Sequence, residues 1–217
     1  MMRTFRIPRA PLAMGCNLYK KATFTFEPGL TVLVGCNGAG KSTLIQMVSQ
    51  SLQKKKIPFL KFNNLTEGGS FARSKAGFYG NFEFLATSIC SSEGENIIMN
   101  MGSYAREIGH LCRSKPEAPE LWFFFDAVDS GLSVDNIVDL KKYLFDTILE
   151  DNQHRDVYII ISANEYELAR DERCLDVQTG ECVRFRNYED YRDFILESRK
   201  KKNKRDEESS KEKKEEK

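Results

Sequence analysis

The feature that most constrains the fold is a glycine-rich segment between two apolar segments of different periodicity. Residues 30–34 read LTVLV, which predicts a buried strand, and residues 35–43 then read GCNGAGKST. After this segment, apolar residues recur at helical spacing at Leu44, Ile45 and Val48. A strand that turns into a helix through glycines lets successive backbone N–H groups converge at the helix N-terminus, where an anion is favoured. The sequence therefore predicts a strand–loop–helix unit with an anion-binding loop.

The glycine-rich segment matches the P-loop pattern GxxxxGK[ST], in which the backbone cradles phosphate groups. The residues expected to contact the phosphates are Gly35, Asn37, Gly38, Ala39, Gly40, Lys41, Ser42 and Thr43. Lys41 is expected to reach the β- and γ-phosphate oxygens, and the Ser42 hydroxyl is expected to bind Mg²⁺. The alternative is an ordinary glycine-rich turn before a helix.

A second candidate for the metal shell follows the most apolar segment of the chain. Residues 121–125 read LWFFF, which is typical of a strand buried on both faces of a parallel sheet, and Asp126 comes next. A P-loop needs an acidic residue at the end of such a strand to hold magnesium. The alternative role for Asp126 is that of a helix N-cap.

The remaining segments alternate between strand and helix patterns. Strands are expected at residues 57–62 and 157–161, and residues 175–185 are expected to form a hairpin. Residues 21–26 and 30–34 are expected to be two strands joined by a tight turn at Pro28 and Gly29. Helices are expected at residues 92–111, after Val134 and after Tyr188. The predicted class is α/β, with a mostly parallel central sheet, an N-terminal antiparallel edge and flanking helices.

Charge divides the 217 residues into two parts. The net charge of +1 argues against a uniformly basic nucleic-acid coat protein and against an acidic disordered chain. Residues 197–217 hold ten basic and seven acidic residues, which leaves residues 1–196 with 23 basic and 25 acidic. We expect a single domain over residues 1–196 and a charged, disordered tail over residues 197–217. The basic segment 199–205, RKKKNKR, is either a solvated tail or a contact for a nucleic-acid backbone.

Apolar segments also bear on localisation. No stretch approaches the roughly 18 apolar residues of a membrane helix, and the N-terminus lacks the apolar core of a signal peptide. We therefore expect a cytoplasmic protein without a membrane partner.

Three motifs, in order, resemble those of the ABC-class ATPases. Residues 35–43 are similar to the P-loop of that class, and residues 126–133, DAVDSGLS, to its Walker B strand and D-loop. Residues 91–95, SSEGE, resemble the ABC signature motif and lie between the other two. Read alone, the same five residues are equally suited to cap a helix. The whole chain resembles the short stand-alone ATPases common in phage genomes.

The resemblance implies an ABC-type P-loop NTPase fold, ATP and Mg²⁺ as cofactors, and an ATP-dependent homodimer. In that class two protomers enclose ATP head to tail, so Ser92 and Gly94 would complete the site of the partner. Asp126 and Ser42 would hold the metal.

Two departures from the class pattern concern hydrolysis. Ala127 stands where the class places the glutamate that polarises water, and Asn164 is the nearest match to the switch histidine. An amide can hydrogen-bond a phosphate oxygen or water but cannot take a proton at neutral pH. Asp129 and Glu165 are candidate replacement bases. The alternative role for Asp129 is to shape the D-loop turn, and the alternative role for Glu165 is to cap the helix that follows it.

Two further positions of the class pattern stay open. The Q-loop position falls to Asn63, Asn64 or Glu67. Tyr19 could stack on adenine or pack against the sheet.

The sequence thus predicts an ATPase that dimerises around Mg²⁺-ATP, hydrolyses it slowly with Lys41, Asp126, Asp129 and Asn164 as catalytic residues, and switches an unknown partner. The alternative is a non-hydrolytic, ATP-dependent interaction module, associated with nucleic acid through the basic segment.

Overall fold

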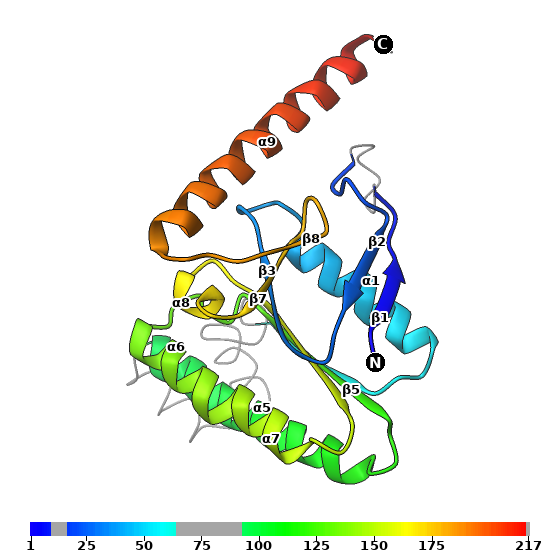
Figure 1. The fold of residues 1–217 in the computed structure, drawn as a ribbon, viewed down its shortest axis with the longest axis vertical. Helices are drawn as coiled ribbons and strands as arrows, with labels where there is room; N and C mark the ends of the chain where they lie inside the picture. The colour runs from blue at the N-terminus through cyan, green and yellow to red at the C-terminus, as the bar shows by residue number, and fades with distance from the viewer. Residues whose placement is uncertain (10–16, 64–92, 216–217) are drawn as a thin grey trace, which may run out of the picture.

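The computed structural model describes residues 1–9, 17–63 and 93–215, with side chains described outside residues 93–100 and 209–215. Its centre is a six-stranded sheet in the order β4-β5-β6-β3-β7-β8 (Figure 1). The strands are β3 (Gly29–Val34), β4 (Phe59–Asn63), β5 (Glu120–Asp126), β6 (Asp156–Ser162), β7 (Arg173–Asp176) and β8 (Glu181–Val183). All neighbours are parallel except β7 and β8, so the expected mostly parallel α/β sheet is confirmed.

The N-terminal strands form a separate sheet. β1 (Arg3–Arg6) pairs antiparallel with β2 (Thr23–Phe26), whereas β3 lies between β6 and β7. The two strands expected within residues 21–26 and 30–34 both form, but they belong to different sheets, because both edges of β3 are taken by β6 and β7. The antiparallel edge of the central sheet is β8, at the C-terminal side of the sequence, and not an N-terminal strand.

Helices cover both faces of the central sheet. In Figure 1, α1 lies on the side of β1 and β2, and α5, α6 and α7 lie on the opposite side. The helical segments are α1 (Lys41–Lys54), α5 (Glu93–Ser114), α6 (Val134–Leu140), the π-helical η1 (Lys141–Asp146), α7 (Thr147–Asp151), α8 (Tyr166–Ala169) and α9 (Tyr188–Glu215).

Strand β5 is buried on both faces of the sheet. Trp122 and Phe124 pack with α1 and the N-terminal strands, whereas Phe123 and Phe125 pack on the other face with α5 and the helical run after it. All seven residues of β5 are buried. The apolar residues 121–125 therefore form a strand buried on both faces, as predicted.

Helix α9 crosses the boundary predicted at residue 196. It is one continuous helix from Tyr188 to Glu215, and it projects from the body of the molecule (Figure 1). The segment expected to be a disordered tail thus continues a helix that starts in the domain. Among the described residues, none of the helices is both long and apolar enough to cross a membrane.

Candidate functional site

The glycine-rich loop connects β3 to α1 as predicted, and its glycines adopt conformations that other residues rarely take. The φ angles of Gly35, Gly38 and Gly40 are 145°, 76° and 106°. A Cβ atom on Gly35 would lie 3.0 Å from the Cβ of Ala39. The loop therefore requires glycine at these positions, both for backbone angles and for space.

Lys41 is the first residue of α1 and turns back into the loop. Its side chain is buried, and its Nζ donates to the carbonyl oxygens of Gly35 at 2.6 Å and Cys36 at 3.4 Å. Burial lowers the pKa of Lys41, and the negative charge of Asp129 opposes this shift. The ammonium group thus lies within the loop, where a phosphate would offer it better acceptors than carbonyl oxygens.

The two residues predicted to bind magnesium are in direct contact. The Ser42 hydroxyl donates to Oδ1 of Asp126 at 2.9 Å, although 84 positions separate them in sequence. Asp126 is 1% exposed at the carboxyl end of β5. A carboxylate beside a hydroxyl is the hard oxygen set that Mg²⁺ prefers, so these residues fit the ion.

Two further residues orient the Asp126 carboxylate. Ser162, the last residue of β6, donates to Oδ1 at 2.6 Å and accepts the N–H of Ala127 at 2.8 Å. Asn63, the last residue of β4, donates to Oδ2 at 3.1 Å. Of the three Q-loop candidates, Asn63 thus contacts Asp126, and Asn64 and Glu67 lie outside the described residues. Ser162 had no assigned role in the sequence, because its partner is on a neighbouring strand.

Asp129 is bound to the backbone of the loop after β6. Its Oδ2 accepts the N–H of Asn164 at 2.5 Å and the N–H of Glu165 at 2.7 Å. Its Oδ1 is buried without a hydrogen-bond partner among the described residues. The structure thus brings Asp129 and Asn164 together through a main-chain contact, while Asn164 and Glu165 are exposed. The catalytic roles of Asp129 and Asn164 stay predictions.

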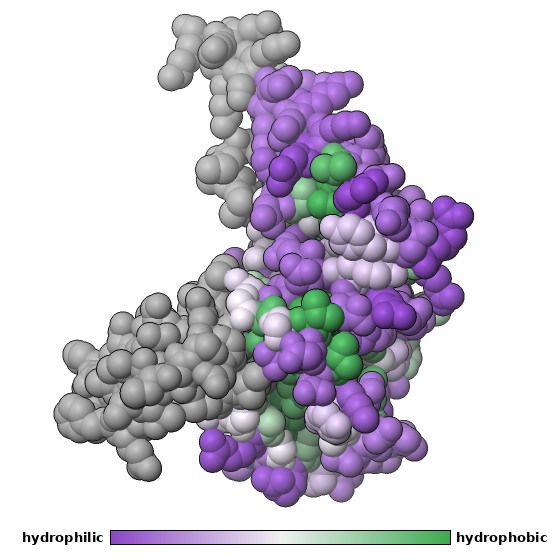
Figure 2. All heavy atoms as spheres, turned by 90° about the vertical axis from the view of Figure 1, so that its left-hand side faces the viewer, coloured by the Kyte–Doolittle hydropathy of each residue, from purple (hydrophilic) through white to green (hydrophobic). Residues whose placement is uncertain are grey.

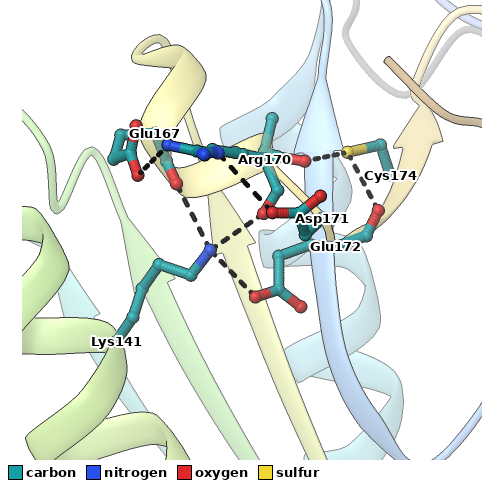
Figure 3. Close-up of polar contacts among 7 residues, drawn as sticks. Lys141, Glu167, Arg170, Asp171, Glu172 and Cys174 are labelled. Carbon is teal, nitrogen blue, oxygen red and sulfur yellow. Dashed lines mark hydrogen bonds and ion pairs between the residues drawn. The ribbon is translucent and has the colours of Figure 1, made fainter. Parts of the chain in front are cut away.

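The same loop is held at its far end by Lys141. Its Nζ donates to the carbonyl oxygens of Glu167 at 3.3 Å and Arg170 at 3.0 Å, and pairs with Glu172 at 2.9 Å (Figure 3). A cation at the C-terminal end of α8 is favourable because the last helical carbonyls lack partners. Asp129 and Lys141 therefore attach the chain before and after α8 to the segment that follows β5.

The expected signature residues are described only in part. Gly94 is in the first turn of α5, and Ser92 lies outside the described residues.

Tyr19 packs under the glycine-rich loop. It is 1% exposed, its hydroxyl donates to the Gly40 carbonyl at 2.9 Å, and its ring meets Phe24 edge to face. Burial raises the pKa of this hydroxyl. Of the two roles left open for Tyr19, the structure favours packing over stacking on a base.

Helix α9 supplies loop contacts that sequence reasoning missed. The Cys36 N–H donates to the Ser198 hydroxyl at 3.0 Å, and the Lys202 side chain passes over Gly38. These residues follow the glycine-rich loop by more than 160 positions and belong to no motif, so no local pattern could reveal them.

Comparisons with known proteins match parts of the chain. The family model described as MukB N-terminal matches residues 14–100, which include the glycine-rich loop. The DNA double-strand break repair Rad50 ATPases of Methanosarcina mazei and Methanosarcina acetivorans are 40% and 38% identical over 63 residues. Each match covers 28% of this chain and 6% of the relative, so the chain spans a small fraction of these relatives' length. In these parts the chain is similar to the Rad50 ATPases and to the N-terminal region of MukB.

Proposed function

We propose that this protein is an ABC-type P-loop ATPase that binds Mg²⁺-ATP and uses it to switch its association with a partner. The observation that carries the proposal is the contact between Ser42 and Asp126 beside a loop that holds Lys41 inward. A glycine turn with only a structural role has no need for a buried carboxylate there. The partial similarity to Rad50 ATPases supports the same chemistry.

The roles follow from the chemistry of each group. The N–H groups of residues 37–43 would bind phosphate oxygens, and Lys41 would move its three N–H donors from loop carbonyls to phosphate. Ser42 and Asp126 would hold Mg²⁺, with Asn63 and Ser162 fixing the carboxylate. When bound, the ion neutralises charge on the β- and γ-phosphates.

The first test is a calorimetric titration of ATP with magnesium. Lys41→Ala should weaken binding by at least about tenfold, because a hydrogen bond to a charged group contributes about 1.5–3 kcal/mol. Lys54→Ala removes a lysine from the exposed side of the same helix and should leave the affinity unchanged. Equal affinity of Lys41→Ala and the unaltered protein would contradict the proposal.

Slow hydrolysis is the expected consequence of Ala127. Its methyl group cannot polarise water, and Asp129 already accepts two backbone N–H groups. This arrangement also favours the second candidate function, a module that binds ATP without cleaving it. Single-turnover cleavage assays separate the two, and a large rate gain in Ala127→Glu would show that the remaining site is competent.

Dimerisation would place Ser92 and Gly94 of one protomer on the nucleotide of the other. We expect the protein to double its mass in light scattering when Mg²⁺-ATP is added, and Ser92→Arg to prevent this. A mass independent of ATP in the unaltered protein would contradict the dimer. Since the similar Rad50 proteins are named for DNA double-strand break repair, DNA is the partner to test first.

A further inference from the structure

Helix α9 contacts the phosphate loop through one buried hydrogen-bonded chain. The Cys36 N–H donates to the Ser198 hydroxyl at 3.0 Å, and this hydroxyl donates to Oε1 of Gln178 at 3.2 Å. Ser198 is 3% exposed and Gln178 is 6% exposed. A serine hydroxyl has a single hydrogen, so donation to Gln178 leaves its lone pairs for the Cys36 amide. The hydrogen bonds therefore run in one direction, from the Cys36 N–H to Ser198 and from Ser198 to Gln178.

Gln178 is itself fixed from three sides. Its backbone N–H donates to Asp176 at 2.9 Å, its carbonyl accepts the N–H of Lys20 at 2.8 Å, and its side-chain amide donates to the Ser198 carbonyl at 3.4 Å. The acceptor for the Ser198 hydroxyl therefore has little freedom to move. Gln178 follows β7, and β7 is the neighbour of β3 in the sheet. Through Gln178, α9 is therefore connected to the strand from which the loop starts.

Two other contacts hold later residues of the same loop. Lys202, one turn beyond Ser198, has its Cε 2.8 Å from the place of a Cβ on Gly38. The Lys202 ammonium is paired with Asp206 on the same helix at 2.8 Å. Tyr19 meets the loop at Gly40. Cys36 and Gly40 are thus hydrogen-bonded to groups outside the loop, and the Lys202 side chain lies close to Gly38 between them.

We infer that Ser198 and Gln178 are positioning residues of the phosphate loop, so that α9 is part of the nucleotide site and not an appendage. This inference rests on the proposed function. Backbone N–H groups bind an anion well when they are already oriented before it arrives. Removing the Ser198 hydroxyl leaves the buried Cys36 N–H without its acceptor, and the loop then relaxes away from this conformation.

The test measures affinity for ATP and for inorganic triphosphate, which has no nucleoside to bind elsewhere. Ser198→Ala should weaken both ligands by roughly threefold to tenfold, the range expected for one buried hydrogen bond. Gln178→Ala should act in the same direction with a smaller factor, because it removes the hydrogen bonds between Gln178 and Ser198 and leaves the one from Cys36 to Ser198 in place. Lys200→Ala, an exposed position on the same helix, is the matched control and should bind as the unaltered protein does.

The melting temperature of each variant separates positioning from general stability. A purely structural Ser198 would lower the melting temperature and leave the affinity of the folded protein unchanged, which would overturn the inference. Tighter binding by Ser198→Ala would also overturn it, since α9 would then restrain the loop. If Ser198→Ala does not fold, Gln178→Ala decides by the same criterion.

Failure of this inference is distinguishable from failure of the proposed function. If the unaltered protein binds neither ligand, the proposed function fails. If the unaltered protein binds, Lys41→Ala binds at least about tenfold more weakly, and Ser198→Ala binds normally, only the role of α9 is refuted.

Discussion

Ala127 adopts a backbone conformation that suits glycine better than alanine. Its φ is 54°, it directly follows Asp126, and its N–H donates to the Ser162 hydroxyl. A left-handed conformation costs an L-residue roughly 1–2 kcal/mol. We expect Ala127→Gly to raise the free energy of unfolding by about 1 kcal/mol, as measured by urea denaturation. Ala163→Gly, at a fully buried residue outside the positive-φ set, should instead destabilise the protein; destabilisation by both changes would contradict the strain.

Asp129 joins two loops at the end of the sheet. Asp129→Ala leaves the N–H groups of Asn164 and Glu165 without their acceptor, and we expect a loss of about 2 kcal/mol in the free energy of unfolding. Asp129→Asn keeps an acceptor oxygen and should lose less. Urea denaturation measures both. If Asp129 is also the base, Asp129→Asn will stop ATP cleavage while stability is largely kept; equal stability of Asp129→Ala and the unaltered protein would contradict the structural role.

The thiols of β7 and β8 should differ widely in reactivity. Burial, together with the negative charge of Glu172, raises the pKa of Cys174 to about 12. Because the thiolate is the nucleophile, Cys174 should resist alkylation at pH 7–9 and react only as the pH approaches that value. Cys182 is exposed on the neighbouring strand and should react first. Peptide mass spectrometry after iodoacetamide treatment measures both, and equal labelling in the folded protein would contradict the assignment; labelling in urea is the control.

Among the elements, β1 is attached to the central sheet by an ion pair. The Arg3 guanidinium donates to both carboxylate oxygens of Glu120, at 2.8 Å and 2.6 Å, and Glu120 is buried. The hydrogen bond to the Glu120 carboxylate raises the pKa of Arg3. Arg3→Ala leaves the buried Glu120 carboxylate without its cation. After allowance for the partial exposure of Arg3, we expect a loss of about 1–3 kcal/mol in the free energy of unfolding.

Arg6 provides the matched control for this pair. It is exposed on the same strand, so Arg6→Ala should change the free energy of unfolding by less than about 0.5 kcal/mol. Thermal or urea denaturation of the two variants checks the difference. Equal effects would mean that the ion pair contributes nothing specific.

Elements with a strong local pattern were predictable from the sequence. β3, β5 and β6 are buried on both faces of the sheet, so their sequences are apolar enough to be recognised as strands. The loop at residues 35–40 is recognisable because its backbone has positive φ angles that glycine adopts readily. β1 was missed because its four residues carry only one buried side chain, and its place depends on pairing with β2. The expected N-terminal antiparallel edge of the central sheet was wrong, because a turn sequence predicts a change of direction and not the partner of a strand.

Only part of the candidate site was predictable from the sequence. The contact of Ser42 with Asp126 followed from two motifs, each recognisable alone. The contributions of Ser162 and Ser198 were not predictable, because a serine in a strand or charged helix carries no signal until its neighbour in space is known. The π-helical turn of η1 was equally hidden, since residues 134–148 fit an ordinary helix in sequence.

For the molecule as a whole, positive charge gathers where α9 meets the N-terminal segment. A cleft of about 540 Å³ is lined by Arg9, Asn17, Leu18, Tyr19, Lys20, Gln178, Lys201, Lys204, Arg205 and Glu208. The upper part of the molecule, where α9 projects, is mostly hydrophilic in Figure 2. Five basic residues against one acidic residue give this cleft the charge that a nucleic-acid backbone requires.

If DNA is a partner, this cleft should carry part of the contact. Lys201→Glu combined with Lys204→Glu should weaken binding of duplex DNA in fluorescence anisotropy and make it less steeply dependent on salt. The matched control is Lys54→Glu with Lys55→Glu, two exposed lysines at the end of α1. Equal losses from both double variants would indicate a general charge effect, and unchanged binding would exclude the cleft.

Helix α9 reaches from Cys36 at the phosphate loop to a projecting end, and this geometry imposes a thermodynamic condition on any partner of that end. If ATP changes the affinity of α9 for a partner by some factor, the partner must change the affinity for ATP by the same factor. Titrating either ligand in the presence of the other would therefore give the same coupling constant. A nucleotide titration alone would then reveal that a partner has bound, with no need to detect the partner itself.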